Sequence, residues 1–252
     1  RQQRHREALA FVDELLLADP VDAQLWAYRV NAYLARERHD AAARAIEQAI
    51  RLDCADPQLI ATLGDLYLNR NQPTDALRAY EAAFHETTPD LNRILHALEG
   101  FLMVRDDAGT RRMIRRAEQR IETSGDDVPP ALRTRLLRLK GRFAQQQNRP
   151  QDAEAVYRRV LRRDPLDGAT LLLLAELLQN TGRLDEAIAA CKRAARIEGS
   201  ATEALVRQAQ VEVARENYEA AVPLLEKAQS INPRPHISRY LDQVRAAAPP
   251  IP

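Results

Sequence analysis

Three arginines close together in the sequence, Arg135, Arg138 and Arg142, have a spacing suited to binding an anion. They lie three and four residues apart, so in a helix their side chains share one face. Each guanidinium group presents paired N–H donors that match a carboxylate or a phosphate. We therefore predict an anion-binding face, and the alternative is a stripe of solvated arginines. Because exposed charges contribute little to stability, we expect Arg138→Glu with Arg142→Glu to remove binding without much loss of stability.

The segment around these arginines is also basic. Residues 105–163 contain 16 Lys and Arg against 8 Asp and Glu, although the whole chain has a net charge of +1. Aromatic residues that could stack on bases are lacking among the other arginine groups, so we do not expect a nucleic-acid partner. A nucleic-acid-binding repeat protein is kept as a further alternative. These groups are Arg111, Arg112, Arg115 and Arg116, and Arg158, Arg159, Arg162 and Arg163.

No other residue pattern indicates catalysis. The P-loop, GxSxG, HExxH and GxGxxG motifs are absent from the sequence. The five histidines lack metal-ligand spacing, and Cys54 and Cys191 form neither a CxxC site nor a disulfide framework. We therefore expect a non-catalytic protein without a metal or a cofactor. No apolar run is long enough to span a membrane.

The helices that would carry these residues follow from a repeated pattern, which is clearest in residues 57–90. Two sets of apolar or small residues each share one helix face, and the small members let two antiparallel helices approach closely. The pattern closely resembles the tetratricopeptide repeat motif, W-x2-L-G-x2-Y followed by A-x3-F-x2-A and P. The matching residues, at positions 7, 8, 11, 20, 24 and 27 of this stretch, are Leu63, Gly64, Tyr67, Ala76, Tyr80 and Ala83.

The pattern recurs every 34 residues, although residues 91–124 match it least well. One step is nine residues longer than the others, and we interpret the extra residues, 125–133, as an insertion between two halves. The alternative is a longer loop. The N-terminal half, 1–124, has a half-repeat and three repeats, and the C-terminal half, 134–252, has three repeats and a capping helix. Position 20 is occupied by Ala42, Ala76, Thr110, Ala153, Ala187 and Ala221.

The resemblance implies an all-α, right-handed superhelical solenoid of helix-turn-helix repeats whose first helices line a concave groove. Family members that hold peptides use positions 2, 5, 9, 12 and 13 of each first helix. Amides there would bond an extended peptide backbone and leucines would form an apolar floor, unless these are ordinary solvated residues. The sixth repeat places Glu203, Val206 and Gln210 at such positions. The predicted partner-binding residues are Gln24, Asn31, Leu34, Gln58, Asp65, Leu68, Asn69, Asn92, Leu102, Arg135, Arg138 and Arg142.

We therefore expect an interaction scaffold that binds a protein or peptide, either as a peptide segment or as a partner helix. The three arginines suggest an acidic segment in that partner. An alternative is a sensor or interaction module from a larger bacterial regulator or enzyme, because the chain begins in mid-repeat and ends on a proline-rich segment. The 34 Arg against three Lys favour a bacterial source with GC-rich codons. Localisation in the cytoplasm or in the periplasm stays open.

Overall fold

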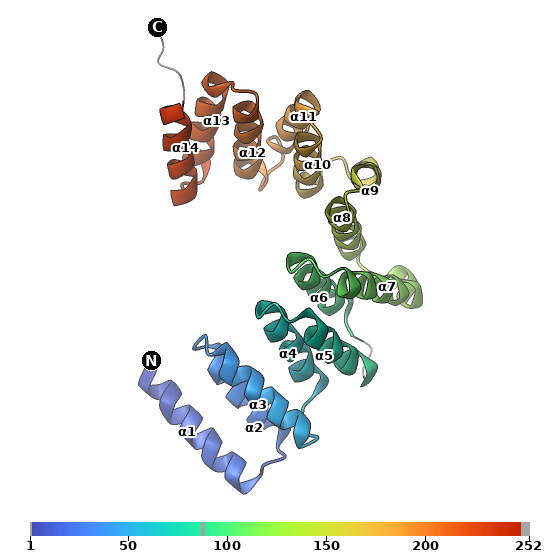
Figure 1. Cartoon of the computed structure of the whole chain (residues 1–252), viewed down its shortest axis with the longest axis vertical. Coiled ribbons are helices and arrows are strands. Elements are labelled where there is room, and N and C mark those ends of the chain that lie inside the picture. Colours follow the sequence, from blue (N-terminus) through green and yellow to red (C-terminus); the bar gives the residue numbers. More distant parts are fainter. Residues whose placement is uncertain (1, 87–88, 248–252) are drawn as a thin grey trace. The chain divides into compact units, whose positions relative to one another are not determined.

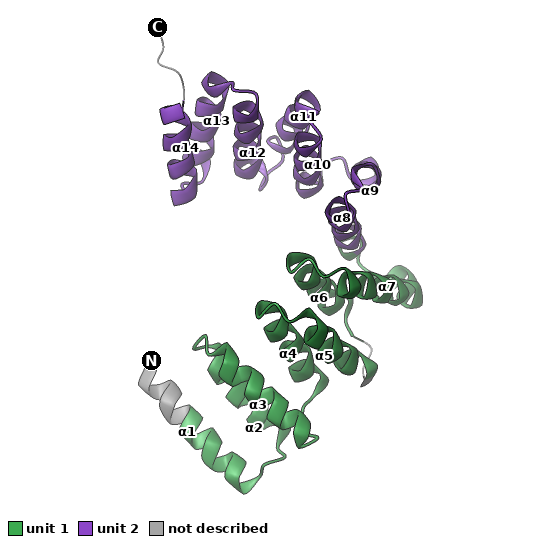
Figure 2. Cartoon of the chain, viewed as in Figure 1, with its two compact units in different colours: residues 1–132 green, residues 133–252 purple. Residues whose placement is uncertain are grey.

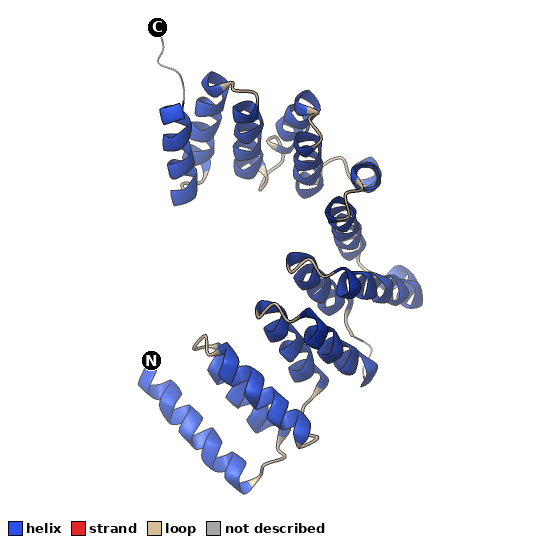
Figure 3. Cartoon of the chain, in the orientation of Figure 1, coloured by secondary structure: helices blue, strands red, loops and turns tan. Residues whose placement is uncertain are grey.

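The computed structural model describes residues 2–86 and 89–247, with side chains from Leu9 onward apart from that of Glu86. The proline-rich end, residues 248–252, lies outside this range. Within the described range the chain forms fourteen α-helices and no strand (Figures 1 and 3). The helices are α1 (Gln2–Ala18), α2 (Ala23–Leu34), α3 (His39–Arg51), α4 (Pro57–Asn69), α5 (Pro73–Glu86), α6 (Leu91–Met103), α7 (Asp107–Ser124), α8 (Pro130–Gln146), α9 (Pro150–Arg163), α10 (Gly168–Asn180), α11 (Leu184–Ala194), α12 (Ala201–Ala214), α13 (Tyr218–Ile231) and α14 (Pro235–Ala247).

The chain divides into two compact units, residues 1–132 and residues 133–252 (Figure 2). The boundary falls within the insertion predicted at 125–133. Helix α7 ends at Ser124, and Gly125 follows it with a φ of 50°. Helix α8 already begins at Pro130, so the first helix of this repeat starts earlier than the 34-residue spacing predicts. That the insertion is a seam between two halves of the repeat array, and not merely a longer loop, stays a prediction.

Burial confirms the 34-residue register in both units. Position 20 lies on the second helix of each hairpin, and its side chain is at most 1% exposed in all six whole repeats. Thr110 is the one residue there that is not alanine, and its hydroxyl is satisfied by donating to the Asp106 carbonyl at 2.6 Å. The third repeat, which matches the motif least well in sequence, is therefore packed like the others.

A glycine packed against a tyrosine ring closes one hairpin in each unit. A Cβ added to Gly64 on α4 would lie 2.8 Å from the Tyr80 ring of α5, closer than real Cβ contacts allow. Gly141 on α8 meets Tyr157 of α9 in the same way, and both tyrosines are fully buried. The glycine of the motif is therefore required by the bulky ring that faces it.

The turn inside each hairpin has the same backbone conformation. The residue at position 15 has a φ between 54° and 76° in all six whole repeats. The next N–H then donates to the carbonyl five residues earlier, as from Asp106 to Phe101 at 3.0 Å, which is the Schellman arrangement. Asn and Gly favour this conformation, whereas Glu and Arg do not, so packing of the hairpin imposes it. These residues are Glu37, Asn71, Arg105, Asn148, Gly182 and Glu216.

Helix α14 closes the C-terminal end of unit 2. Ile237, Leu241 and Val244 are buried in a cluster with residues of α12 and α13, as the sequence predicts. Arg239 and Asp242 on the opposite face are exposed. A last helix with one apolar face and one polar face ends the stack without leaving a large apolar surface in water.

Candidate functional site

The predicted amides of unit 1 lie on its first helices and are exposed. Three of them, Gln24 on α2, Gln58 on α4 and Asn92 on α6, occupy position 2 of three successive repeats. Asn31 and Asn69 are exposed nearer the other ends of α2 and α4. The structure therefore repeats an amide at one position of each first helix in unit 1.

The predicted leucines do not form an exposed apolar floor, which corrects that part of the sequence interpretation. Leu68 is 6% exposed and Leu102 is 2% exposed, and Leu34 is partly buried. Leu68 lies against Gly100 of α6, so its side chain fills the space between adjacent first helices. Position 12 in this unit thus contributes to packing and leaves little apolar surface for a partner.

Asp65 joins three helices of unit 1. Its carboxylate accepts hydrogen bonds from the Tyr80 hydroxyl and from Arg93 Nη2 at 2.6 Å, and His96 Nε2 lies 3.4 Å away. The Arg93 guanidinium also lies 5.6 Å from the centroid of the Tyr80 ring. Burial, followed by the nearby Asp65 charge, raises the pKa of Tyr80 far above its ordinary value, so the phenol stays protonated and donates. Asp65 is therefore a connector of α4, α5 and α6 with only part of its carboxylate facing outward.

The three predicted arginines of α8 differ in their surroundings. Arg138 Nη1 lies 3.0 Å from Asp167 Oδ1, and the Asp167 side chain is only 8% exposed. Arg135 is partly buried and is itself engaged within the chain. Arg142 is exposed. The structure therefore places the three on one helix but neutralises Arg138, which weakens the case for a shared anion site.

Several of the other arginines are also paired. Arg112 lies 2.6 Å from Glu81, and Arg158 lies 2.7 Å from Glu154. Arg116 of α7 donates to the Phe84 carbonyl. These charges are partly neutralised or used in packing, which reduces the attraction of a polyanion such as nucleic acid.

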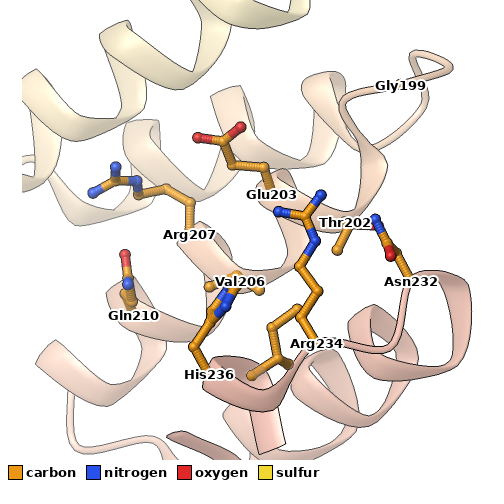
Figure 4. A pocket seen from close by; sticks show the side chains of 10 residues that line it. Gly199, Thr202, Glu203, Val206, Arg207, Gln210, Asn232, Arg234 and His236 are labelled. Atoms are coloured by element: carbon orange, nitrogen blue, oxygen red, sulfur yellow. The ribbon is translucent and has the colours of Figure 1, made fainter. Parts of the chain in front are cut away.

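A pocket in unit 2 lies between α12 and the start of α14, with a volume of about 440 Å³. Figure 4 shows Glu203, Val206 and Gln210 on its α12 side, and Arg234 and His236 on the side of the α13–α14 connection. The first three occupy positions 2, 5 and 9 of the sixth repeat, where the family resemblance expects binding residues. Thr202, Arg207, Asn232, Ile237 and Gly199 complete the lining.

The charged groups of this pocket are not all paired. Arg207 donates to Glu176 at 3.2 Å, which neutralises it. The Arg234 backbone N–H donates to Gln229 Oε1 at 3.1 Å, which holds the connection in place. By contrast, the side chains of Glu203, Arg234 and His236 have no hydrogen-bond or ion-pair partner within the described residues. Sequence reasoning missed Arg234 and His236, because neither occupies a first-helix position of a repeat: Arg234 lies at the end of the sixth repeat and His236 follows that repeat.

The possible metal ligands and the two cysteines are dispersed over the described part of the chain. No group of three or more His, Cys, Asp and Glu residues there could hold a metal ion. Cys54 is partly buried and Cys191 is buried, and both are free thiols. Among the same residues, no helix combines the length and the apolar character needed to cross a bilayer.

Helix hairpins repeated every 34 residues, with small residues at their contacts and a capping helix at one end, define an all-α repeat solenoid. Sequence models of the tetratricopeptide repeat match residues 1–57, 138–201 and 202–235, which together make up more than half of the chain. The chain therefore belongs to the tetratricopeptide repeat family. A comparison of its sequence with curated proteins found no match.

Solved structures share the fold at low sequence identity. A tetratricopeptide repeat protein from Parabacteroides merdae is 12% identical, with 97% of this chain and 93% of that chain covered and a TM-score of 0.66. The C-terminal part of a TPR repeat-containing protein from Cytophaga hutchinsonii is 13% identical, with 94% and 95% covered and a TM-score of 0.59. The pilF protein of Pseudomonas aeruginosa is 18% identical, with 95% and 98% covered and a TM-score of 0.50. At these identities the likeness concerns the fold alone.

Proposed function

We propose that this chain is a non-catalytic interaction scaffold that holds an extended peptide across the first helices of unit 1. The observation that carries the proposal is the exposed amide at position 2 of three successive repeats, in α2, α4 and α6. An amide side chain donates and accepts at once, so it can pair with both groups of a peptide bond. A peptide bound in this way would be recognised mainly through its backbone.

The spacing of the amides suits an extended chain. Axes of packed helices lie about 10 Å apart, and an extended peptide advances about 3.3 Å per residue. Each repeat therefore corresponds to about three peptide residues, so successive amides would meet every third peptide bond. Asn92 already interacts within the chain, so Gln24 and Gln58 carry the main part of this proposal.

Burial of the predicted leucines and pairing of Asp65 also favour a polar partner for unit 1. Leu68 and Leu102 are buried, so an apolar floor is not part of the proposal. Asp65 is held by Tyr80 and Arg93, and its carboxylate is then available mainly to orient the exposed His96. The proposed partner of unit 1 is accordingly an extended polar segment rather than an apolar helix.

Selection of displayed peptides that bind the full chain tests this function. Random peptides of about twelve residues would be selected, and their affinities measured for wild type and for Gln24→Ala combined with Gln58→Ala. We expect the double variant to bind about tenfold more weakly, since each amide pair contributes about 0.5–1.5 kcal/mol. Gln48→Ala is the matched control, because Gln48 is an exposed amide on the second helix α3.

Hydrogen exchange measured with and without bound peptide locates the binding surface. Bound peptide should slow exchange in α2 and α4 and leave α3 unchanged. Failure to select any peptide, or equal affinities for the double variant and wild type, would refute the proposal. Equal weakening by Gln48→Ala would show that the peptides bind another face.

A further inference from the structure

We propose that the pocket of unit 2, between α12 and the start of α14, binds an aliphatic α-amino acid through its carboxylate and its ammonium group. This inference concerns a different surface from the peptide face of unit 1 and does not depend on it. It rests on three properties of the pocket: opposite charges on its two sides, the absence of partners for those charges within the described residues, and an apolar lining residue, Val206.

The two sides of the pocket carry opposite charges. Glu203 projects from α12, whereas Arg234 reaches into the pocket from the α13–α14 connection (Figure 4). His236 and Asn232 lie on the same side as Arg234 and can donate further hydrogen bonds. A guanidinium with neighbouring N–H donors suits a carboxylate, and a carboxylate suits an ammonium group. An α-amino acid carries both groups on adjacent atoms.

The charges of Glu203 and Arg234 are available to a ligand. They make no ion pair with each other or with any other described residue, although both line the same pocket. Arg207 also lines the pocket, but it does not pair with the Glu203 carboxylate, because its guanidinium donates to Glu176 at 3.2 Å. The pocket thus offers one unpaired cation and one unpaired anion, which favours a zwitterion over a ligand with a single charge.

The apolar side chain in the lining and the size of the pocket limit the rest of the ligand. Val206 is partly buried and lines the pocket, so an aliphatic side chain can contact it, whereas Ile237 is 1% exposed and belongs mainly to the core. Thr202 and Gln210 add uncharged polar groups to the lining. The volume of about 440 Å³ lies in the range of small-molecule sites, which is about 300–1,000 Å³. A leucine-sized amino acid fits these limits, whereas the ordinary C-terminus of a peptide supplies a carboxylate without the ammonium group.

Calorimetric titration of the full chain with L-leucine tests the proposal. L-leucinamide lacks the carboxylate and N-acetyl-L-leucine lacks the ammonium group, so each should bind at least about tenfold more weakly than leucine. Glu203→Gln and Arg234→Gln should each weaken leucine binding by about tenfold. Arg239→Gln is the matched control, since Arg239 is an exposed arginine of α14 outside the pocket, and it should leave the affinity unchanged.

Three results would overturn this inference. The absence of saturable leucine binding would refute the proposal. Binding of N-acetyl-L-leucine as tight as that of leucine would show a carboxylate site for peptide ends instead. Equal affinities for Arg234→Gln and Arg239→Gln would place the ligand elsewhere. The peptide measurements on unit 1 use other residues, so either proposal can fail while the other stands.

Discussion

Replacement of Arg138 tests an ion pair that ties α8 to the start of α10 in unit 2. Its Nη1 lies 3.0 Å from Oδ1 and 3.1 Å from Oδ2 of Asp167. Asp167 also caps α10 by accepting the Thr170 N–H at 2.9 Å. Replacement of Arg138 therefore leaves a nearly buried carboxylate with the helix cap alone. This geometry corrects the expectation that Arg138→Glu would cost little stability.

The expected loss in the free energy of unfolding on replacement of Arg138 lies between two limits. Loss of one partner from a fully buried ion pair costs about 3–5 kcal/mol, whereas an exposed pair contributes about 0.2–1 kcal/mol. The Arg138 side chain is 27% exposed and that of Asp167 is 8% exposed, and the cap of α10 still stabilises the carboxylate. We therefore expect Arg138→Gln to lower the free energy of unfolding by about 1–2 kcal/mol. Arg138→Glu adds repulsion between carboxylates and should cost about 2–4 kcal/mol.

Urea denaturation of the full chain, followed by circular dichroism, measures this effect. With a slope of about 1–2 kcal/mol per molar urea, Arg138→Gln should lower the midpoint of the transition that contains unit 2 by about 1 M. Hydrogen exchange should accelerate in the first turn of α10. Arg142→Gln is the control, because Arg142 is exposed, and its effect should stay within about 0.5 kcal/mol. Equal midpoints for the two variants would refute the argument.

The repeat register could be predicted from the sequence because it depends on packing between residues close in the chain. Gly64 and Tyr80 belong to one hairpin, and the ring leaves no room for a Cβ at the glycine. Position 20 is enclosed in the same way, so a small residue recurs there every 34 residues. Such contacts repeat with the hairpin and leave a periodic trace in the sequence. The capping helix was predictable for a similar reason, since its apolar face has helical spacing.

The partners of polar groups could not be predicted in the same way. Arg138 and Asp167 are 29 residues apart, and Asp167 caps the first helix of the next repeat, so their contact depends on how one hairpin is stacked on the next. Asp65 occupies a position typical of peptide contacts, yet its carboxylate is already paired with Arg93 of the following repeat. Leu68 is buried because Gly100 lets α6 approach it closely. Each outcome depends on an inter-repeat distance that the motif does not specify.

Two remaining predictions concern buried small groups on second helices. Ala76 is 0% exposed, so Ala76→Leu should lower the free energy of unfolding by about 1–3 kcal/mol in urea denaturation, whereas the exposed control Ala82→Leu should change it by less than about 0.5 kcal/mol. Burial raises the pKa of Cys191 to about 12, so its stabilising contribution is complete below the unfolded pKa near 9 and is lost as pH rises toward 12. At pH 8 a disulfide reagent should modify Cys54 first and reach Cys191 only on unfolding. Equal rates for both thiols in the native protein would contradict the burial of Cys191.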